Sequence, residues 1–342
     1  MTDMAIVAKA APVTTQIDSR LSAGFDMFEI QLLDVNFAPE EAYKILSAYG
    51  SQIDIRNIHT PLSADGSDIT LSDVMFNAKS RTAFYNTCEL AAQFAVGHDV
   101  GVVIHNDIPG NYLETHSEFA YHLAEVLKKV FAYAGVKIEI ENTTTISSYK
   151  GRMVFRSGTE PFDTPQVVRY LRDAFGADRF GFVFDIGHYA IMRKLIRFFT
   201  DSCLREYVHN PTLEELWTYS EDVLDVIHLS SIQGFGYGVD HGKPFYEWEP
   251  RDREFVRRVL KLYEGTAKKP VFVVEVKESN YDNCWNLEHT TNTIETVLND
   301  MHPDSLLGDI SEVERVLIYP DPDSNKGTHY HAIEAKSVVI ED

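Results

Sequence analysis

The chain has 342 residues, 44% of them hydrophobic and 24% charged, which is enough for one large core in a single α/β barrel. Its 52 acidic and 31 basic residues give a formal net charge of −21, which opposes long contact with a phosphate backbone, so we do not expect a nucleic-acid partner. Three scattered cysteines, no signal-peptide pattern and no apolar run of membrane-spanning length predict a cytoplasmic protein without a membrane partner.

Eight short apolar runs, rich in β-branched and aromatic residues, recur along the chain. They predict strands at Met4–Lys9, Met27–Leu33, Gln52–His59, Val100–His105, Val136–Glu141, Phe180–Asp185, Leu224–Leu229 and Pro270–Val276. Strands that are apolar almost throughout are typical of parallel sheets covered by helices.

Amphipathic patterns lie between these runs. They predict helices at Pro39–Tyr49, Leu71–Val96, Ser117–Ala134, Pro165–Phe175, Leu213–Tyr219, Arg251–Tyr263 and Leu287–Met301, with a shorter, poorer helix at Gln16–Ala23. Eight alternating strand–helix units predict a closed (β/α)8 TIM barrel, which we assign to residues 1–302. Residues 303–342 form a C-terminal extension packed on or beside the barrel, with a strand in VERVLIYP and its return strand in THYHAIEAK.

Two connections are longer than the rest. An extra helix rich in arginine and aromatic residues is expected at 190–205, and residues 230–250 form a glycine-rich, aromatic loop. Both follow strand ends that carry polar residues, where long loops usually form lids or substrate walls. The extra helix and the C-terminal extension are also candidates for a dimer interface, so a homo-oligomer stays open.

Carboxylates and histidines stand at the ends of successive apolar runs. They are His59, His105, Glu141, Asp185, His188, His228 and Glu275. In a parallel barrel these ends meet on one face, above apolar interior residues such as Val183 and Val273. Three carboxylates and an imidazole suit a catalytic divalent ion (Mn, Mg, Co, Zn or Fe), so we predict a metal site at Glu141, Asp185, His228 and Glu275. The alternative is that some of these carboxylates form salt bridges within the barrel.

The remaining polar residues have more than one interpretation. His59 and His105 could hold a second metal that shares Glu141, hydrogen-bond a substrate hydroxyl or orient Glu141, and we place substrate binding or support of Glu141 ahead of a second metal. His188 reaches the site three residues after Asp185, and Lys277 at the barrel mouth would meet an anionic substrate group. Glu29 and Glu139 are candidates for buried support of the ligands. Asp240 and His241 are adjacent, and adjacent side chains usually diverge, so a shared ion is not expected there.

The pattern resembles the xylose isomerase-like TIM-barrel superfamily, which joins sugar isomerases and epimerases to endonuclease IV. The resemblance covers roughly residues 4–301. It is carried by the strand-end Glu141-Asn142-Thr143, the Asp-x-x-His of Asp185–His188, the His228-Leu229 pair and Glu275.

For sugar isomerases and epimerases, the resemblance implies carbohydrate metabolism and one divalent ion held by the four predicted ligands. The ion chelates neighbouring oxygens of a small hydroxy-carbonyl substrate and stabilises the enediolate formed by proton removal. Glu141 and Glu275 would act as paired acid and base, and His188 would hold a substrate oxygen. A divalent-metal-dependent isomerase or epimerase of a sugar, polyol or related compound is therefore our leading hypothesis.

The alternative is a multinuclear metallohydrolase of phosphodiesters like endonuclease IV. There the resemblance implies that His59 and His105 join Glu141 around one ion, and that His188 binds another with a loop Asp-x-His. This chain has Asp240 and His241 without an intervening residue, which departs from that pattern. A recruited metal-dependent oxidation or dehydration of a small molecule is a third hypothesis, and a barrel that only binds a ligand is a fourth. The sequence leaves the substrate, the metal and the oligomeric state open.

Overall fold

The computed structural model describes residues 4–63, 66, 68–144, 146–149, 152–155, 160–198, 209–233, 240–302, 318–320 and 330–332. The chain divides into two compact units, Met1–Leu298 and Asn299–Asp342. In the second unit, β13 (Ile318–Pro320) pairs antiparallel with β14 (Tyr330–Ala332), which agrees with the predicted strand and return strand. That the extension packs on the barrel stays a prediction.

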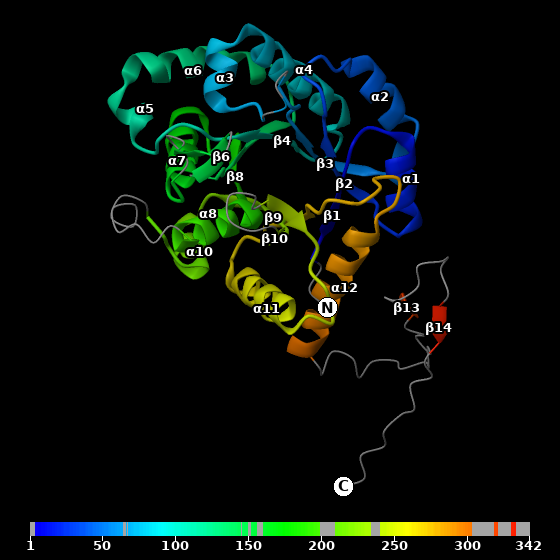
Figure 1. Cartoon of the computed structure of the whole chain (residues 1–342). Coiled ribbons are helices and arrows are strands. Elements are labelled where there is room, and N and C mark those ends of the chain that lie inside the picture. The colour runs from blue at the N-terminus through cyan, green and yellow to red at the C-terminus, as the bar shows by residue number, and fades with distance from the viewer. Residues whose placement is uncertain are drawn as a thin grey trace. The chain divides into compact units, whose positions relative to one another are not determined.

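Eight parallel strands of the first unit close into a barrel, in the order β1-β12-β9-β8-β5-β4-β3-β2 (Figure 1). Their bounds are β1 Ile6–Ala10, β2 Met27–Gln31, β3 Asp54–His59, β4 Val100–His105, β5 Val136–Glu141, β8 Phe180–Asp185, β9 Leu224–Leu229 and β12 Val271–Val274. The bounds of β4, β5, β8 and β9 are the predicted ones, because each apolar run ends where a polar residue begins. The predicted (β/α)8 barrel is confirmed.

Valines from five strands pack together in the barrel interior. They are Val7, Val103, Val183, Val226 and Val273. Because side chains alternate along a strand, the residues two positions further on also face inward, at the carboxyl ends of the strands. This is how Val183 places Asp185, and how Val273 places Glu275, at the mouth of the barrel.

Helices lie outside the strands (Figure 1). They are α1 Thr14–Ser22, α2 Pro39–Ser47, α3 Leu71–Phe76, α4 Ala78–Phe94, α5 Tyr112–Thr115, α6 Ser117–Val130, α7 Asp163–Phe175, α8 Ile186–Phe198, α10 Leu213–Ser220, α11 Pro250–Gly265 and α12 Trp285–Met301, with a 3-10 turn at Gly50–Gln52. Each predicted helix has a counterpart among these.

The prediction of one continuous helix over Leu71–Val96 is wrong. The backbone at Asn77 is extended, with φ −107° and ψ 113°, and it separates α3 from α4. The Asn77 side chain accepts hydrogen bonds from the backbone N–H groups of Lys79 and Ser80. Asn77 thus caps the N-terminus of α4, so that a new helix begins there and α3 does not continue. The apolar periodicity of the sequence does not reveal this break.

Two short hairpins at the carboxyl ends of the strands were not predicted. β6 (Ile146–Tyr149) pairs with β7 (Arg152–Phe155), and β10 (Ser231–Gln233) pairs with β11 (Asp240–Lys243). The glycines at 234–238 of the predicted loop lie outside the described residues. The extra helix, expected from residue 190, begins as α8 at Ile186, immediately after β8. His188 therefore lies in the first turn of a helix.

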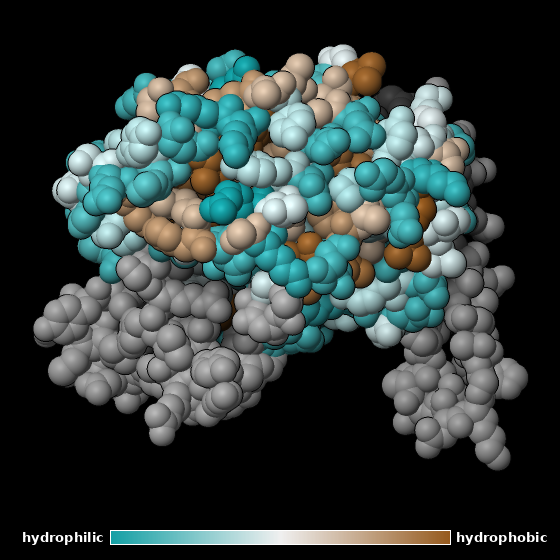
Figure 2. All heavy atoms as spheres, turned by 90° about the horizontal axis from the view of Figure 1, so that it is seen from above, coloured by the Kyte–Doolittle hydropathy of each residue, from teal (hydrophilic) through white to brown (hydrophobic). Residues whose placement is uncertain are grey.

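The face of the molecule seen in Figure 2 is mainly hydrophilic, and its hydrophobic residues are scattered rather than gathered in one patch. Single exposed hydrophobic residues are common on protein surfaces. Among the described residues, no helix is both long and apolar enough to cross a membrane.

Candidate metal centre

The four predicted metal ligands meet at the carboxyl end of the barrel. Glu141 ends β5, Asp185 ends β8, His228 lies in β9, and Glu275 directly follows β12. One donor atom from each lies within 4.8 Å of the others. We call these residues the quartet. Three of its members are fully buried, whereas the Glu275 side chain is 19% exposed.

Three quartet atoms are buried without a hydrogen-bond partner in the described part of the chain: Asp185 Oδ2, His228 Nδ1 and Glu275 Oε2. His228 Nδ1 and Glu275 Oε2 lie 2.8 Å apart but are not aligned for a hydrogen bond. An unsatisfied buried polar atom costs about 1–3 kcal/mol, and three that converge on one point call for a common partner. A divalent cation fits these oxygen and nitrogen donors.

The quartet carries strong and opposed electrostatic effects. Burial raises the pKa of Asp185, and His188 and His241 offset that effect only in part. Burial also favours the neutral form of Glu141, but His105 and His228 outweigh it and hold the pKa of Glu141 well below its usual range. The buried carboxylates of the quartet therefore need positive charge beside them, which a bound divalent cation would supply.

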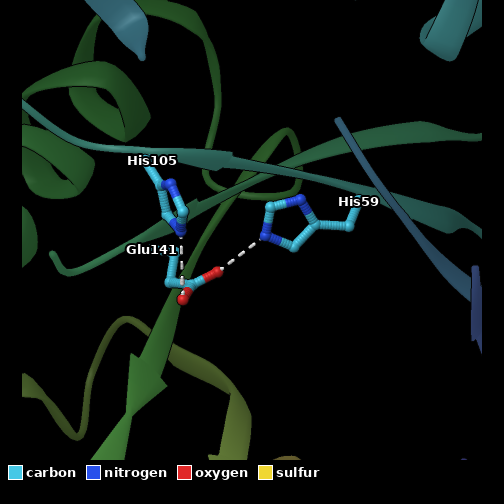
Figure 3. Close-up of side chains that lie close together, drawn as sticks. All are labelled: His59, His105 and Glu141. Carbon is cyan, nitrogen blue, oxygen red and sulfur yellow. Dashed lines mark hydrogen bonds and ion pairs between the residues drawn. The ribbon is translucent and has the colours of Figure 1, made fainter. Parts of the chain in front are cut away.

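A second group lies beside the quartet and shares Glu141 with it. It consists of His59, His105 and Glu141, all buried (Figure 3). His59 Nε2 lies 3.1 Å from Glu141 Oε2, and His105 Nε2 lies 3.3 Å from Glu141 Oε1. The other ring nitrogen of His59 donates to the carbonyl of Thr60 at 3.0 Å. The contact with Thr60 fixes the ring so that Nε2 points towards Glu141, as the outer hydrogen bond of a metal-binding histidine does.

A third group combines Asp185, His188 and His241. The start of α8 brings His188 back towards β8, where its backbone N–H donates to Asp185 Oδ1 at 2.6 Å. His241 comes from β11, and its ring lies 4.6 Å from that of His188. Asp240 is not in the group because its carboxylate pairs with Lys277. The predicted divergence of the two neighbours is wrong, because His241 Nδ1 lies 3.4 Å from Asp240 Oδ1. His241 was not among the predicted ligands, because only the β10–β11 hairpin brings it there.

Lys9 is a functional candidate that the sequence pattern did not identify. It lies in β1, and its ammonium group lies 2.7 Å from Glu275 Oε1 and 3.2 Å from Glu29 Oε1. Burial favours neutral lysine, but Glu275 and Glu29 outweigh that effect and raise the pKa of Lys9. A lysine near the end of a strand usually reaches the surface, so the sequence alone did not mark Lys9 as part of the site.

A cavity of about 290 Å³ opens beside the quartet. It is lined by Lys9, Ala10, Ala11, Gln16, Gln31, Leu33, His241, Gly242, Glu275, Val276, Lys277 and Tyr281. Glu275 is the quartet member among them, and Lys277 also lines the wall, while its contact with substrate stays a prediction. His59, His105 and His188, predicted as substrate-binding residues, are buried in the metal-type groups and are not among the lining residues. Small-molecule sites are typically concave and combine apolar surface with polar groups that fix the ligand's orientation.

Known proteins share this architecture. A family profile described as xylose isomerase-like TIM barrel matches residues 19–306. No curated protein matches the chain significantly at the sequence level.

Among solved structures, a xylose isomerase domain protein from Planctomyces limnophilus has 9% identity and a TM-score of 0.56, over 88% of this chain and 98% of that one. An Anabaena variabilis protein described provisionally as a sugar phosphate isomerase/epimerase has 12% identity and a TM-score of 0.48, over 88% of this chain and 100% of that one. A Sinorhizobium meliloti protein has 12% identity and a TM-score of 0.45, over 86% of this chain and 98% of that one. At such identities, structural similarity shows the fold alone.

Proposed function

The chain belongs to the xylose isomerase-like TIM barrel family, and we propose that it is a divalent-metal-dependent isomerase or epimerase of a small hydroxy-carbonyl compound. The observation that carries this proposal is the position of Glu275. It contributes one unsatisfied oxygen to the quartet, and it also lines the cavity in which a substrate would lie. Metal binding and proton transfer at a substrate carbon would therefore occur side by side.

The quartet residues Glu141, Asp185, His228 and Glu275 would hold the ion. A divalent cation at this place supplies a Lewis acid that stabilises negative charge on substrate oxygens. The chain's own residues would supply the rest of the chemistry: a base, and hydrogen-bond donors that orient the substrate.

Glu275 is the base that this geometry favours. Burial favours its neutral form, but Lys9 and His228 outweigh burial and hold the pKa of Glu275 well below its usual range. With Oε2 facing the quartet, its Oε1, which Lys9 contacts at the cavity wall, would accept a carbon-bound proton from a substrate in the cavity. Ala10, Ala11, Leu33 and Val276 give the same cavity apolar surface against which a substrate can pack.

Glu141 has a different environment. Its side chain is 1% exposed, and His59 and His105 approach its two oxygens at 3.1 and 3.3 Å. It does not line the cavity, so these contacts favour a ligand shared between two ion sites over direct contact with substrate. The acid–base role expected for Glu141 stays a prediction.

Solvent exchange at carbon tests the proposal. Metal-reconstituted protein is incubated in D2O with a panel of aldoses, ketoses and polyol-derived ketones, and deuterium incorporation is followed by NMR. We expect incorporation at a carbon next to a carbonyl, lost in Glu275→Gln. The matched control Glu254→Gln lies on the exposed side of α11, where it pairs with Arg257, and should exchange as the wild type does. Exchange that persists in Glu275→Gln would remove Glu275 from the role of base.

A hydrolase of small phosphoesters is a second candidate, because the second and third groups share Glu141 and Asp185 with the quartet. Such sharing would allow up to three neighbouring ions, which suits phosphoester hydrolysis. This candidate predicts about three zinc or manganese ions per chain and hydrolysis of bis(p-nitrophenyl) phosphate. A single tightly held ion and no phosphodiesterase activity would exclude it.

A further inference from the structure

We propose that Lys9 and Glu29 are positioning residues that preset two quartet ligands, His228 and Glu275, for the metal ion. Lys9 holds one oxygen of Glu275, and Glu29 holds one ring nitrogen of His228. The second oxygen of Glu275 and the second nitrogen of His228 then face the other metal ligands. The inference rests on the proposed metal dependence.

The four residues form a closed ring across β1, β2, β9 and the end of β12. Lys9 Nζ lies 3.2 Å from Glu29 Oε1, and Glu29 Oε2 lies 3.0 Å from His228 Nε2. His228 Nδ1 lies 2.8 Å from Glu275 Oε2, and Glu275 Oε1 returns to Lys9 at 2.7 Å. The ring depends on barrel closure, because β1 pairs with β12 on one side and with β2 on the other.

The ring selects which atoms are left for the ion. Lys9 donates to Glu275 Oε1, so Oε2 is the Glu275 oxygen that remains available to an ion. Glu29 accepts from His228 Nε2, so Nδ1 is the His228 nitrogen that remains available. Both remaining atoms are buried without a hydrogen-bond partner among the described residues. Carboxylates that accept from the outer nitrogen of a metal-binding histidine fix its tautomer and ring orientation. The same logic applies to a lysine that holds one oxygen of a carboxylate ligand.

The charges of the ring support the same conclusion. The Lys9 side chain is 11% exposed and that of Glu29 is fully buried, so neither is solvated well enough to be left unpaired. Lys9 is also part of the cavity wall, so it stands where the substrate, the ion and Glu275 meet. Without Lys9, the Glu275 carboxylate would be free to rotate, and both of its oxygens could turn to the ion.

The barrel contains a matched control. Lys137 lies between Glu139, at 3.2 Å, and Asp225, and its side chain is 15% exposed. It has the same ion-pair chemistry as Lys9, but it pairs with no quartet residue. Loss of Lys137 should therefore affect folding as much as loss of Lys9 does, without affecting metal binding.

Cobalt binding to the full-length protein tests the inference. Protein stripped with a chelator is titrated with Co²⁺, and affinity is measured by calorimetry and ligand geometry by visible absorption. We expect Lys9→Met and Glu29→Gln to weaken the tightest Co²⁺ site about 10- to 100-fold and to change its absorption spectrum. Lys9→Arg should restore part of the affinity, and Lys137→Met should leave both affinity and spectrum unchanged.

Glu29→Gln is nearly isosteric, so it carries the test if Lys9→Met does not fold. Wild-type affinity and spectrum in Glu29→Gln and in every folded Lys9 variant would overturn the positioning role while leaving the metal-dependent function intact. A wild-type protein that binds no Co²⁺ would overturn the proposed function itself, and this inference with it.

Discussion

His105 Nδ1 lies 3.3 Å from Asp68 Oδ2, while the other nitrogen of the same ring lies 3.3 Å from Glu141 Oε1. Asp68 comes from the loop between β3 and α3, and its side chain is 41% exposed. The loop thus supplies an outer carboxylate to a buried histidine of the second group. Burial lowers the pKa of His105, but Asp68 and Glu141 outweigh it and hold the pKa well above its usual range.

Asp68→Asn should therefore weaken the ion held by His59, His105 and Glu141. Loss of an outer carboxylate from a metal-binding histidine typically costs 10- to 100-fold in affinity. We expect the variant, dialysed against dilute Zn²⁺, to contain about one ion less per chain than the wild type, with the quartet ion retained. Metal content by plasma mass spectrometry measures the difference.

The matched control for this experiment is Asp54→Asn. Asp54 Oδ1 lies 3.2 Å from His98 Nε2, which is the same carboxylate–imidazole contact outside the three metal-type groups. It should keep the full metal content. Equal metal in Asp68→Asn and the wild type would show that the second group holds no ion or does not need Asp68.

Strand ends could be predicted because they carry a local signal. In β4 and β8 an uninterrupted apolar run ends at His105 or Asp185, and in β5 apolar residues alternate with Lys137 and Glu139 up to Glu141, so the sequence itself marks where each ligand stands. Parallel strands in a barrel then bring these ends together without further information. This is why the quartet could be assigned before its geometry was known.

The remaining contacts of the site depend on pairing between distant segments. Lys9 reaches Glu275 only because β1 closes the barrel against β12, with Ala8 beside Val274. His241 reaches the third group through the pairing of β10 with β11, and Asp68 reaches His105 through a loop. None of these contacts has a characteristic spacing in the sequence, so residue patterns alone could not reveal them.

Gly181→Ala should destabilise the barrel strongly. A Cβ at Gly181 would lie 2.7 Å from the Glu139 carboxyl carbon and would also collide with the Asp225 carboxylate. Both carboxylates are buried and held by Lys137, so they cannot move aside without breaking ion pairs. We expect a loss of about 1–3 kcal/mol in the free energy of unfolding, as for other overpacked interiors.

Urea denaturation measures this effect. Gly265→Ala is the matched control, because Gly265 is the last residue of α11 and nothing lies within 4 Å of its added Cβ. That substitution should leave stability unchanged or raise it by up to about 1 kcal/mol. If both variants unfolded at the same urea concentration, the packing of Glu139 and Asp225 over Gly181 would be contradicted.

Asp185→Asn should have opposite effects on stability with and without metal. Asp185 is fully buried, and its Oδ2 has no hydrogen-bond partner among the described residues. The amide removes a buried negative charge, retains Oδ1 as acceptor for the His188 N–H, and provides a donor towards the neighbouring carboxylates. We therefore expect the metal-free variant to be more stable than the metal-free wild type by about 1–2 kcal/mol.

Saturating Mn²⁺ should reverse this order. A ligand present at 100 times its Kd stabilises the folded state by about 2.7 kcal/mol, and the variant lacks the carboxylate needed to gain that energy. Scanning calorimetry with chelator and with Mn²⁺ gives both comparisons on the same protein. Asp225→Asn is the contrasting variant, because Asp225 pairs with Lys137, Arg172 and Lys268, and its loss should lower Tm in both conditions. If the metal-free Asp185→Asn variant had a lower Tm than the metal-free wild type, Asp185 would be a structural carboxylate and not a ligand prepared for a cation.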